Sequence, residues 1–143
     1  ICPRADYDGH PAVALEAAAA GRPGAGWPAR LRKSDDLFEL DWSGMVRRVL
    51  EGLAAGAEVA DLAAAFHDWL VAGLVEACRA VRAGGGPARV ALSGGCFMNR
   101  RLQASLDAAL REVGFQVYTH RRVPANDGGL CLGQAAVAAA GLA

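Results

Sequence analysis

Residues 88–102 read Ala-Arg-Val-Ala-Leu-Ser-Gly-Gly-Cys-Phe-Met-Asn-Arg-Arg-Leu, and the rest of the chain is organised around them. The first five, Ala88 to Leu92, are mostly apolar and follow the breaker run Gly84-Gly85-Gly86-Pro87, which is typical of a buried strand. Ser93-Gly94-Gly95 then turns the chain, and the spacing from Phe97 onward predicts a helix. The stretch therefore predicts a strand–turn–helix unit of an α/β protein.

A turn of this kind leaves backbone N–H groups free at the start of the following helix. Those groups carry partial positive charge and suit an anion such as a phosphate. Glycine has no side chain to hold a ligand away from the backbone. Many Ser-Gly-Gly turns nevertheless bind nothing, so this turn alone leaves two interpretations open, a phosphate loop and a purely structural turn.

Length and composition narrow the class of protein. A chain of 143 residues is one domain or part of one, and 53% hydrophobic residues suffice for a core. Because 15 acidic residues balance 15 basic ones, nothing indicates binding to nucleic acid or to a membrane surface. No apolar run is long enough to span a bilayer, and there is no signal peptide. The chain begins at Ile1 without a methionine, which suggests a piece excised from a larger protein.

The four cysteines predict neither a zinc knuckle nor a disulfide framework, because no two of them form a CxxC pair. A reduced, cytoplasmic setting is the expectation. They are Cys2, Cys78, Cys96 and Cys131.

The remaining pattern predicts helices first and then a strand–loop–helix–strand–loop–helix order, which is an α/β arrangement. Residues 21–34 are expected to form an exposed connection without regular structure, and Ser43 to cap the helix that follows it. The last helix has small residues and is expected to pack closely against a sheet. The expected helices are 11–20, 44–55, 58–83, 97–113 and 130–140, and the expected strands are 37–42, 88–92 and 115–119.

Two glycine-bearing loops are expected at the carboxyl ends of neighbouring strands, which is where open α/β sheets bind ligands. The first offers the Ser93 hydroxyl, the backbone of Gly94 and Gly95, and Asn99 one turn into the helix. The second offers Asp127 followed by two glycines. A carboxylate beside a phosphate cradle can hold a divalent cation that bridges phosphate oxygens.

Alternatives stay open for several of these residues. Asp127 can instead cap the last helix, and Asn99 can be a surface residue. One carboxylate does not hold a catalytic metal, and the three histidines show no HxxxH spacing, so further ligands are expected outside this sequence. The roles of three residues are left undecided: Asp8 as a possible cap, Glu16 as a solvated carboxylate or a polar contact in a cleft, and His67 as a packing residue or a ligand.

Several segments closely resemble the carboxyl-terminal end of the HypF family of hydrogenase-maturation carbamoyltransferases. Tyr7-Asp8-Gly9 and residues 12–16 resemble an earlier segment of that family, Phe66-His67 also fits, and the resemblance is weak between Gly21 and Asp41. Two segments, Phe97-Met98-Asn99 and Asn126-Asp127-Gly128-Gly129, favour HypF over the other members of the superfamily. The closely similar segments are 93–102, 115–124, 126–130 and 132–135.

The resemblance implies the second half of an actin-like ATPase fold of the sugar-kinase and heat-shock type, with helices packed on a mixed sheet. It implies that carbamoyl phosphate and ATP yield carbamoyl adenylate, and that the carbamoyl group passes to the C-terminal cysteine of a HypE partner to become the cyanide ligand of the [NiFe] hydrogenase centre. By position, Asp127 matches a ligand of a divalent metal, whether Fe, Zn or Mg. Asn99 with Ser93-Gly94-Gly95 matches the nucleotide-binding loop.

The sequence departs from the HypF pattern at two positions, and three other functions stay open. Asp8 stands where a Glu is expected, and Cys96 stands where a small apolar residue is usual, so Cys96 is interpreted as a packing residue and not a nucleophile. The alternatives within the superfamily are an O-carbamoyltransferase of antibiotic or nodulation-factor synthesis and a tRNA threonylcarbamoyltransferase. A third is a non-catalytic docking fragment that is inert without its missing half.

Overall fold

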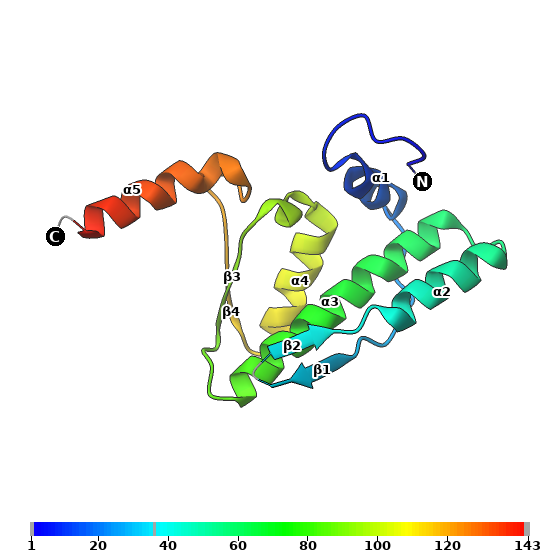
Figure 1. The fold of residues 1–143 in the computed structure, drawn as a ribbon, viewed down its shortest axis with the longest axis horizontal. Coiled ribbons are helices and arrows are strands. Elements are labelled where there is room, and N and C mark those ends of the chain that lie inside the picture. Colours follow the sequence, from blue (N-terminus) through cyan, green and yellow to red (C-terminus); the bar gives the residue numbers. More distant parts are fainter. Residues whose placement is uncertain (1, 36, 142–143) are drawn as a thin grey trace.

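A computed structural model describes residues 2–35 and 37–141, and Figure 1 shows how their elements are arranged. The α/β class expected from the sequence is confirmed. The described strands form two separate two-stranded sheets, β1–β2 antiparallel and β3–β4 parallel. In chain order the elements are α1 (His10–Ala18), β1 (Leu31–Ser34), β2 (Leu37–Leu40), α2 (Ser43–Ala54), α3 (Val59–Ala83), β3 (Arg89–Leu92), the 3-10 turn η1 (Gly95–Met98), α4 (Arg100–Glu112), β4 (Gln116–Thr119), the 3-10 turn η2 (Asp127–Gly129) and α5 (Leu130–Gly141).

The main hydrophobic core lies between α3, α4 and the parallel β3–β4 pair. Helix α4 contributes Leu102, Leu106 and Leu110, whose four-residue spacing places them on one face of the helix. Phe115 and Val117 are both buried, as their alternation in the sequence predicts. A smaller cluster joins α1 to α3 through buried alanines. The main core consists of Val71, Val75, Leu92, Leu102, Leu106, Leu110, Phe115 and Val117.

The register of the parallel pair sets the position of both loops. Leu92 is the partner of Thr119, so the residues that follow, Ser93 and His120, leave the sheet side by side. Both strands run in the same direction, and their carboxyl ends therefore meet at one edge. Each then leads into a glycine-bearing loop, as the sequence predicts.

Two local predictions about residues 21–55 are wrong. Residues 31–34 are not an irregular connection but form β1, which pairs with β2 across a turn where Asp35 has φ 54°. An exposed, polar strand gives no apolar alternation to detect. Ser43 is not the cap of α2 but its first residue, and the Asp41 carboxylate accepts hydrogen bonds from its N–H and its hydroxyl.

These contacts also perturb the Asp41 carboxyl group. Hydrogen bonds from the Ser43 hydroxyl and backbone N–H, together with the one from Arg32, lower the pKa of Asp41 to about 2. They do so because each stabilises the ionised form.

The predicted helix 97–113 is interrupted, because it consists of the short turn η1 followed by α4. Asn99 lies between the two with an extended backbone, φ −70° and ψ 108°, and its Oδ1 accepts a hydrogen bond from the N–H of Leu102 at 2.8 Å. Asn99 is therefore the N-cap of α4 and does not lie one turn into the helix. The apolar spacing hid this break, since it continues through both pieces.

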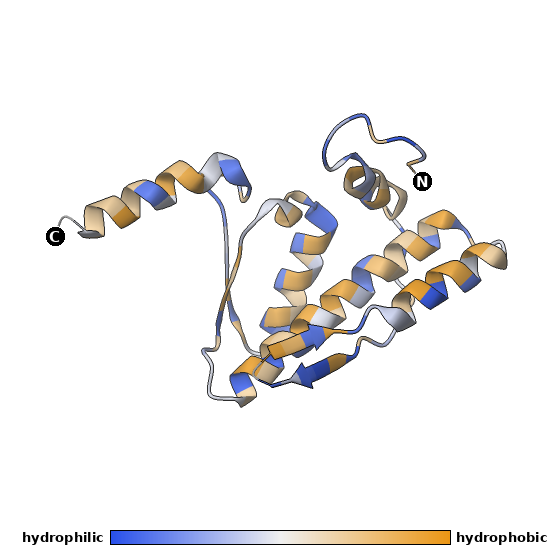
Figure 2. Ribbon diagram, in the orientation of Figure 1, coloured by the Kyte–Doolittle hydropathy of each residue, from blue (hydrophilic) through white to orange (hydrophobic). Residues whose placement is uncertain are grey.

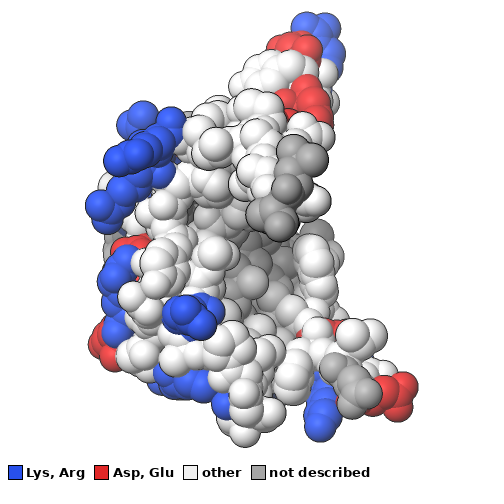
Figure 3. Space-filling view, turned by 90° about the vertical axis from the view of Figure 1, so that its left-hand side faces the viewer, with Lys and Arg blue, Asp and Glu red and all other residues white. Residues whose placement is uncertain are grey.

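Helix α5 projects from the body of the molecule (Figures 1 and 2). None of its described residues is buried. The expected close packing of this helix on a sheet is thus not found within residues 2–35 and 37–141, because the η2 turn directs it away from β3 and β4. Its residues carry no charge. Figure 3, which faces this end of the molecule, shows acidic and basic side chains mainly at the margins. Among the described helices, none has the length and hydropathy required of a transmembrane span.

Candidate nucleotide and metal site

The turn after β3 requires glycine at its centre. Gly94 has φ 107°, a conformation that side chains disfavour, and its N–H donates a hydrogen bond to the carbonyl of Ala125 at 2.9 Å. This bond joins the first loop directly to the second. The two loops that the sequence singles out are therefore in contact.

His120 belongs to this site although the sequence analysis gave it no role. Its Nε2 lies 2.9 Å from the Ser93 hydroxyl oxygen, within hydrogen-bonding distance. The strand register could have revealed this contact, because His120 follows β4 just as Ser93 follows β3. Motif spacing within one segment does not reveal such a pair.

In the second loop, the structure assigns the capping role to Asn126. Its Oδ1 accepts a hydrogen bond from the N–H of Gly128 at 3.1 Å, so Asp127 does not make the cap that was left open as its alternative role. A Cβ on Gly129 would lie 2.5 Å from the Pro124 carbonyl oxygen. Glycine is therefore needed there for the chain to fold back on itself.

The two loops line a common hollow of about 840 Å³, which we call the first hollow. Ser93 and Gly94 lie on one side of it, and Asp127 and His120 also line it. One face of α5 provides an apolar wall. The described lining includes no Lys or Arg, so the charge of a bound anion would be met by backbone N–H groups, His120 and a cation.

Gly95 and Asn99 lie on the other side of the turn, in a second hollow of about 360 Å³ between α1, α3 and η1. Glu16 and His67 also line this second hollow. A Cβ built on Gly95 would meet nothing within 4 Å, so the backbone is open to a ligand there. The Ser93-Gly94-Gly95 turn thus separates two hollows, and the five predicted site residues are divided between them.

The start of α4 forms the polar wall of the second hollow. The Glu16 carboxylate accepts hydrogen bonds from the N–H groups of Arg100 at 2.7 Å and Arg101 at 3.4 Å. The Asn99 Oδ1 accepts from the N–H of Leu102 at 2.8 Å, and the N–H of Asn99 itself donates to the Cys96 carbonyl at 3.2 Å. All four N–H groups that a helix start leaves without partners are therefore satisfied. Glu16 is a polar contact across a cleft, and not simply a solvated carboxylate.

Cys96 is exposed and lines the second hollow. Its interpretation as a packing residue is therefore wrong, because the η1 turn directs it away from the core that the continuous apolar pattern suggested. Cys131 on α5 is also exposed, whereas Cys78 is half-buried. Burial raises the pKa of the Cys78 thiol.

The described side chains at the first hollow provide only part of the ligand set that a bound metal ion needs. Asp127 and His120 line the first hollow, but no group of three or more His, Cys, Asp or Glu side chains is placed to hold a metal ion within residues 2–35 and 37–141. Asp127 can supply one oxygen ligand to a divalent cation. The described residues alone do not form a metal centre, and the metal role of Asp127 stays a prediction.

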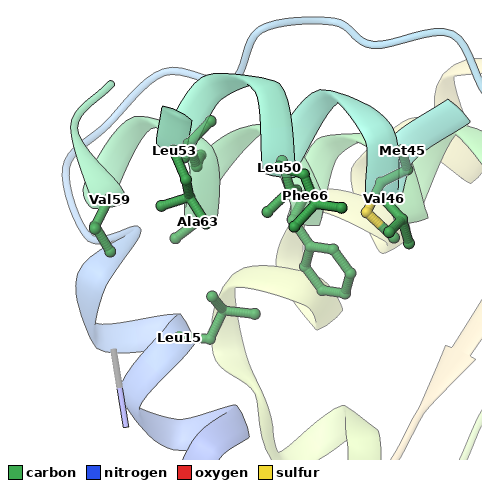
Figure 4. Close-up of a pocket in the computed structure, with 10 residues that line it drawn as sticks. Leu15, Met45, Val46, Leu50, Leu53, Val59, Ala63 and Phe66 are labelled. Carbon is green, nitrogen blue, oxygen red and sulfur yellow. The ribbon is translucent and has the colours of Figure 1, made fainter. Parts of the chain in front are cut away.

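A third hollow, of about 410 Å³, lies between α1, α2 and α3 (Figure 4). Its lining side chains are entirely apolar, including Leu15, Leu50 and Phe66. It offers no donor for a phosphate and no ligand for a metal. This third hollow is therefore not a candidate for the phosphate or metal site.

Comparison with known proteins places this arrangement in a family. Residues 1–134 match the family described as "Carbamoyltransferase, Kae1-like Domain, second subdomain", and the chain belongs to this family. It is 42% identical over 147 residues to the carbamoyltransferase HypF of Rhodobacter capsulatus, a match that covers 99% of this chain. It is 45% identical over 100 residues, 69% of the chain, to the HypF of Rhizobium leguminosarum bv. viciae.

A solved structure is similar in fold as well as in sequence. It is a crystal structure of full-length HypF in the phosphate- and nucleotide-bound form, with a TM-score of 0.87 and 32% identity over 94% of this chain. The resemblance to the HypF family and the fold expected from it are thereby confirmed. The chain spans only 18% of that structure's chain, and 13% and 18% of the Rhizobium and Rhodobacter relatives.

Proposed function

We propose that this chain forms the part of a carbamoyltransferase that binds the nucleotide through the Ser93-Gly94-Gly95 turn. The observation that carries the proposal is the position of this turn between two hollows, one with polar groups for a nucleoside and one with Asp127 for phosphates and a cation. A nucleotide is long enough to lie across such a turn. The similarity to a nucleotide-bound HypF supports the same assignment.

In the proposed complex, the nucleoside occupies the second hollow, where Asn99 offers its remaining amide hydrogen and lone pair. The phosphates lie over Gly94 and Gly95 towards the first hollow, where a backbone free of side chains allows close approach. The Ser93 hydroxyl, held by His120, provides a further polar contact to a phosphate oxygen. A divalent cation bound by Asp127 and by ligands from elsewhere would neutralise part of the phosphate charge.

The proposed reaction is the one implied by the family. Carbamoyl phosphate, ATP and water yield carbamoyl adenylate with release of phosphate and pyrophosphate. The carbamoyl group then passes to the C-terminal cysteine thiol of a HypE-type maturation protein, and AMP leaves. Because the adenylate keeps the nucleotide, the same turn holds the substrate ATP and the activated intermediate. All four cysteines of the chain are free, which supports a reducing, cytoplasmic setting.

Titration of AMP and ATP into the chain by calorimetry tests the nucleotide assignment. We expect Gly95→Val to weaken AMP binding more than tenfold, because the new side chain enters space that the nucleotide would occupy. Gly44→Val is the matched control, since Gly44 also has no atom within 4 Å of a built Cβ and lies in α2 away from both loops. Neither position has a positive φ, so both variants should fold.

Two outcomes would refute the proposal. One is the absence of AMP and ATP binding to the wild-type chain at millimolar concentration, which would favour the inert docking fragment. The other is equal affinity in Gly95→Val and Gly44→Val. Alkylation gives an independent measurement: bound AMP should protect Cys96 from a thiol reagent, whereas Cys131 should react at an unchanged rate.

A further inference from the structure

His67 is a polar side chain buried in the middle of α3, with an exposed fraction of 2%. Its Nδ1 lies 2.7 Å from the carbonyl oxygen of Ala63, one turn earlier in the same helix. Its Nε2 lies 2.9 Å from Nδ2 of Asn99. A buried imidazole with both nitrogens engaged is fully satisfied, and it links the core of α3 to the start of α4.

The hydrogen bonds determine which nitrogen carries the proton. Oδ1 of Asn99 faces the N–H of Leu102, so the other amide atom of Asn99 must be the NH₂ group that faces His67. Nε2 of His67 then has to accept. Nδ1 faces a carbonyl oxygen and has to donate. His67 is therefore neutral with its proton on Nδ1. The three hydrogen bonds donate in one direction, from the Leu102 N–H through Asn99 and His67 to the Ala63 carbonyl.

These hydrogen bonds anchor the end of the glycine turn at Asn99. At the near end, Gly94 is tied to the carbonyl of Ala125. At the far end, Asn99 closes η1 and opens α4, and His67 holds its amide. The backbone of Gly95 and Cys96 lies between these two anchors. A displaced Asn99 would move this segment together with the start of α4.

We infer that His67 is a positioning residue for the nucleotide, which acts through Asn99 to fix the Ser-Gly-Gly turn between the two hollows. The inference rests on the proposed nucleotide function of that turn. A histidine suits this place because the neutral ring can donate at one nitrogen and accept at the other. An apolar side chain of similar size fills the same space but leaves the half-buried Asn99 amide hydrogen that faces it without an acceptor.

Two measurements test the inference. The first is the tautomer of His67 in the ligand-free wild-type chain, read from the ring nitrogen shifts in a long-range ¹H–¹⁵N NMR spectrum. We expect the Nδ1–H form. In Asn99→Asp, which keeps an oxygen for the Leu102 N–H but presents a carboxylate to Nε2, we expect a proton on Nε2 as well. A His67 that is only a packing residue would not change its protonation in this way.

The second measurement is AMP affinity in a pair of variants. His67→Leu removes the acceptor, and loss of one net hydrogen bond predicts binding weakened about five- to tenfold. His67→Gln can still accept from Asn99 and donate to Ala63, so its affinity should stay within about twofold of wild type. Circular dichroism confirms that each variant is folded at the assay temperature. If His67→Leu fails to fold, His67→Met replaces it, because the Met thioether provides at most a weak acceptor for the Asn99 amide.

The outcomes separate this inference from the proposed function. A proton on Nε2 in the wild-type chain, or His67→Leu with wild-type affinity, would overturn the positioning role while leaving nucleotide binding intact. A wild-type chain that does not bind AMP would overturn both. The Nδ1–H tautomer together with weak binding in His67→Leu, or in His67→Met where it is used, but not in His67→Gln would support it.

Discussion

The Glu16 carboxylate joins α1 to α4, and its removal should destabilise the fold measurably. Its Oε1 accepts from the N–H of Arg100 at 2.7 Å and, less closely, from that of Arg101 at 3.4 Å. A hydrogen bond to a charged group contributes about 1.5–3 kcal/mol. Since Glu16 is half-buried and its second contact is long, we count one full bond. Glu16→Ala should therefore lower the free energy of unfolding by about 2 kcal/mol.

Urea denaturation followed by tryptophan fluorescence measures this change. With a slope of about 2 kcal/mol per molar urea, the midpoint should fall by about 1 M. Glu16→Gln keeps a neutral acceptor in the same position and should lose about 1 kcal/mol. The decrease should therefore follow the charge as well as the contact, as expected for an acceptor at a helix N-terminus.

Glu112→Ala is the matched control. It removes an exposed carboxylate at the C-terminal end of α4, whereas Glu16 contacts the N-terminal end of that helix from α1. It should change the free energy of unfolding by no more than about 0.5 kcal/mol. If Glu16→Ala unfolds at the same urea concentration as Glu112→Ala, the capping role of Glu16 is wrong. The explanation given for the polar wall of the second hollow then fails with it.

Three further predictions concern the acid response, a thiol and the core. The pKa of Asp41 is lowered in the folded chain, so its stabilising contribution is present above about pH 4 and is lost as the pH falls towards about 2. Asp41→Asn should remove that part of the acid dependence of the melting temperature between pH 2 and 5. An unchanged dependence of the melting temperature on pH would contradict this. Burial raises the pKa of Cys78, so iodoacetamide should alkylate it more slowly than Cys131 at pH 8, and equal rates by mass spectrometry would show that Cys78 is accessible. Leu110 is fully buried, and Leu110→Ala should cost about 3 kcal/mol in a urea titration; a cost below about 1 kcal/mol would mean that α4 does not pack as described.

Much of the fold could be predicted from local sequence. The long helix α3 ends at Ala83, where the stop at Gly84 predicted it, and β3 and β4 lie within the expected segments. The two glycine loops meet because parallel strands bring their carboxyl ends to one edge. Strand β1 was missed because an exposed polar strand has no hydrophobic period, and the break at Asn99 was hidden by an apolar spacing that continues across it.

The sequence by itself determined the strand–turn–helix unit at residues 88–102 and the loop that carries Asp127, because both depend on short-range periodicity and on glycine. Only the tertiary structure decided which side of the turn each side chain faces. Glu16 reaches Arg100 across 84 residues, and Asn99 meets His67 across 32. Such contacts depend on the packing of α1 and α4 against α3, and no local pattern encodes the geometry of that packing.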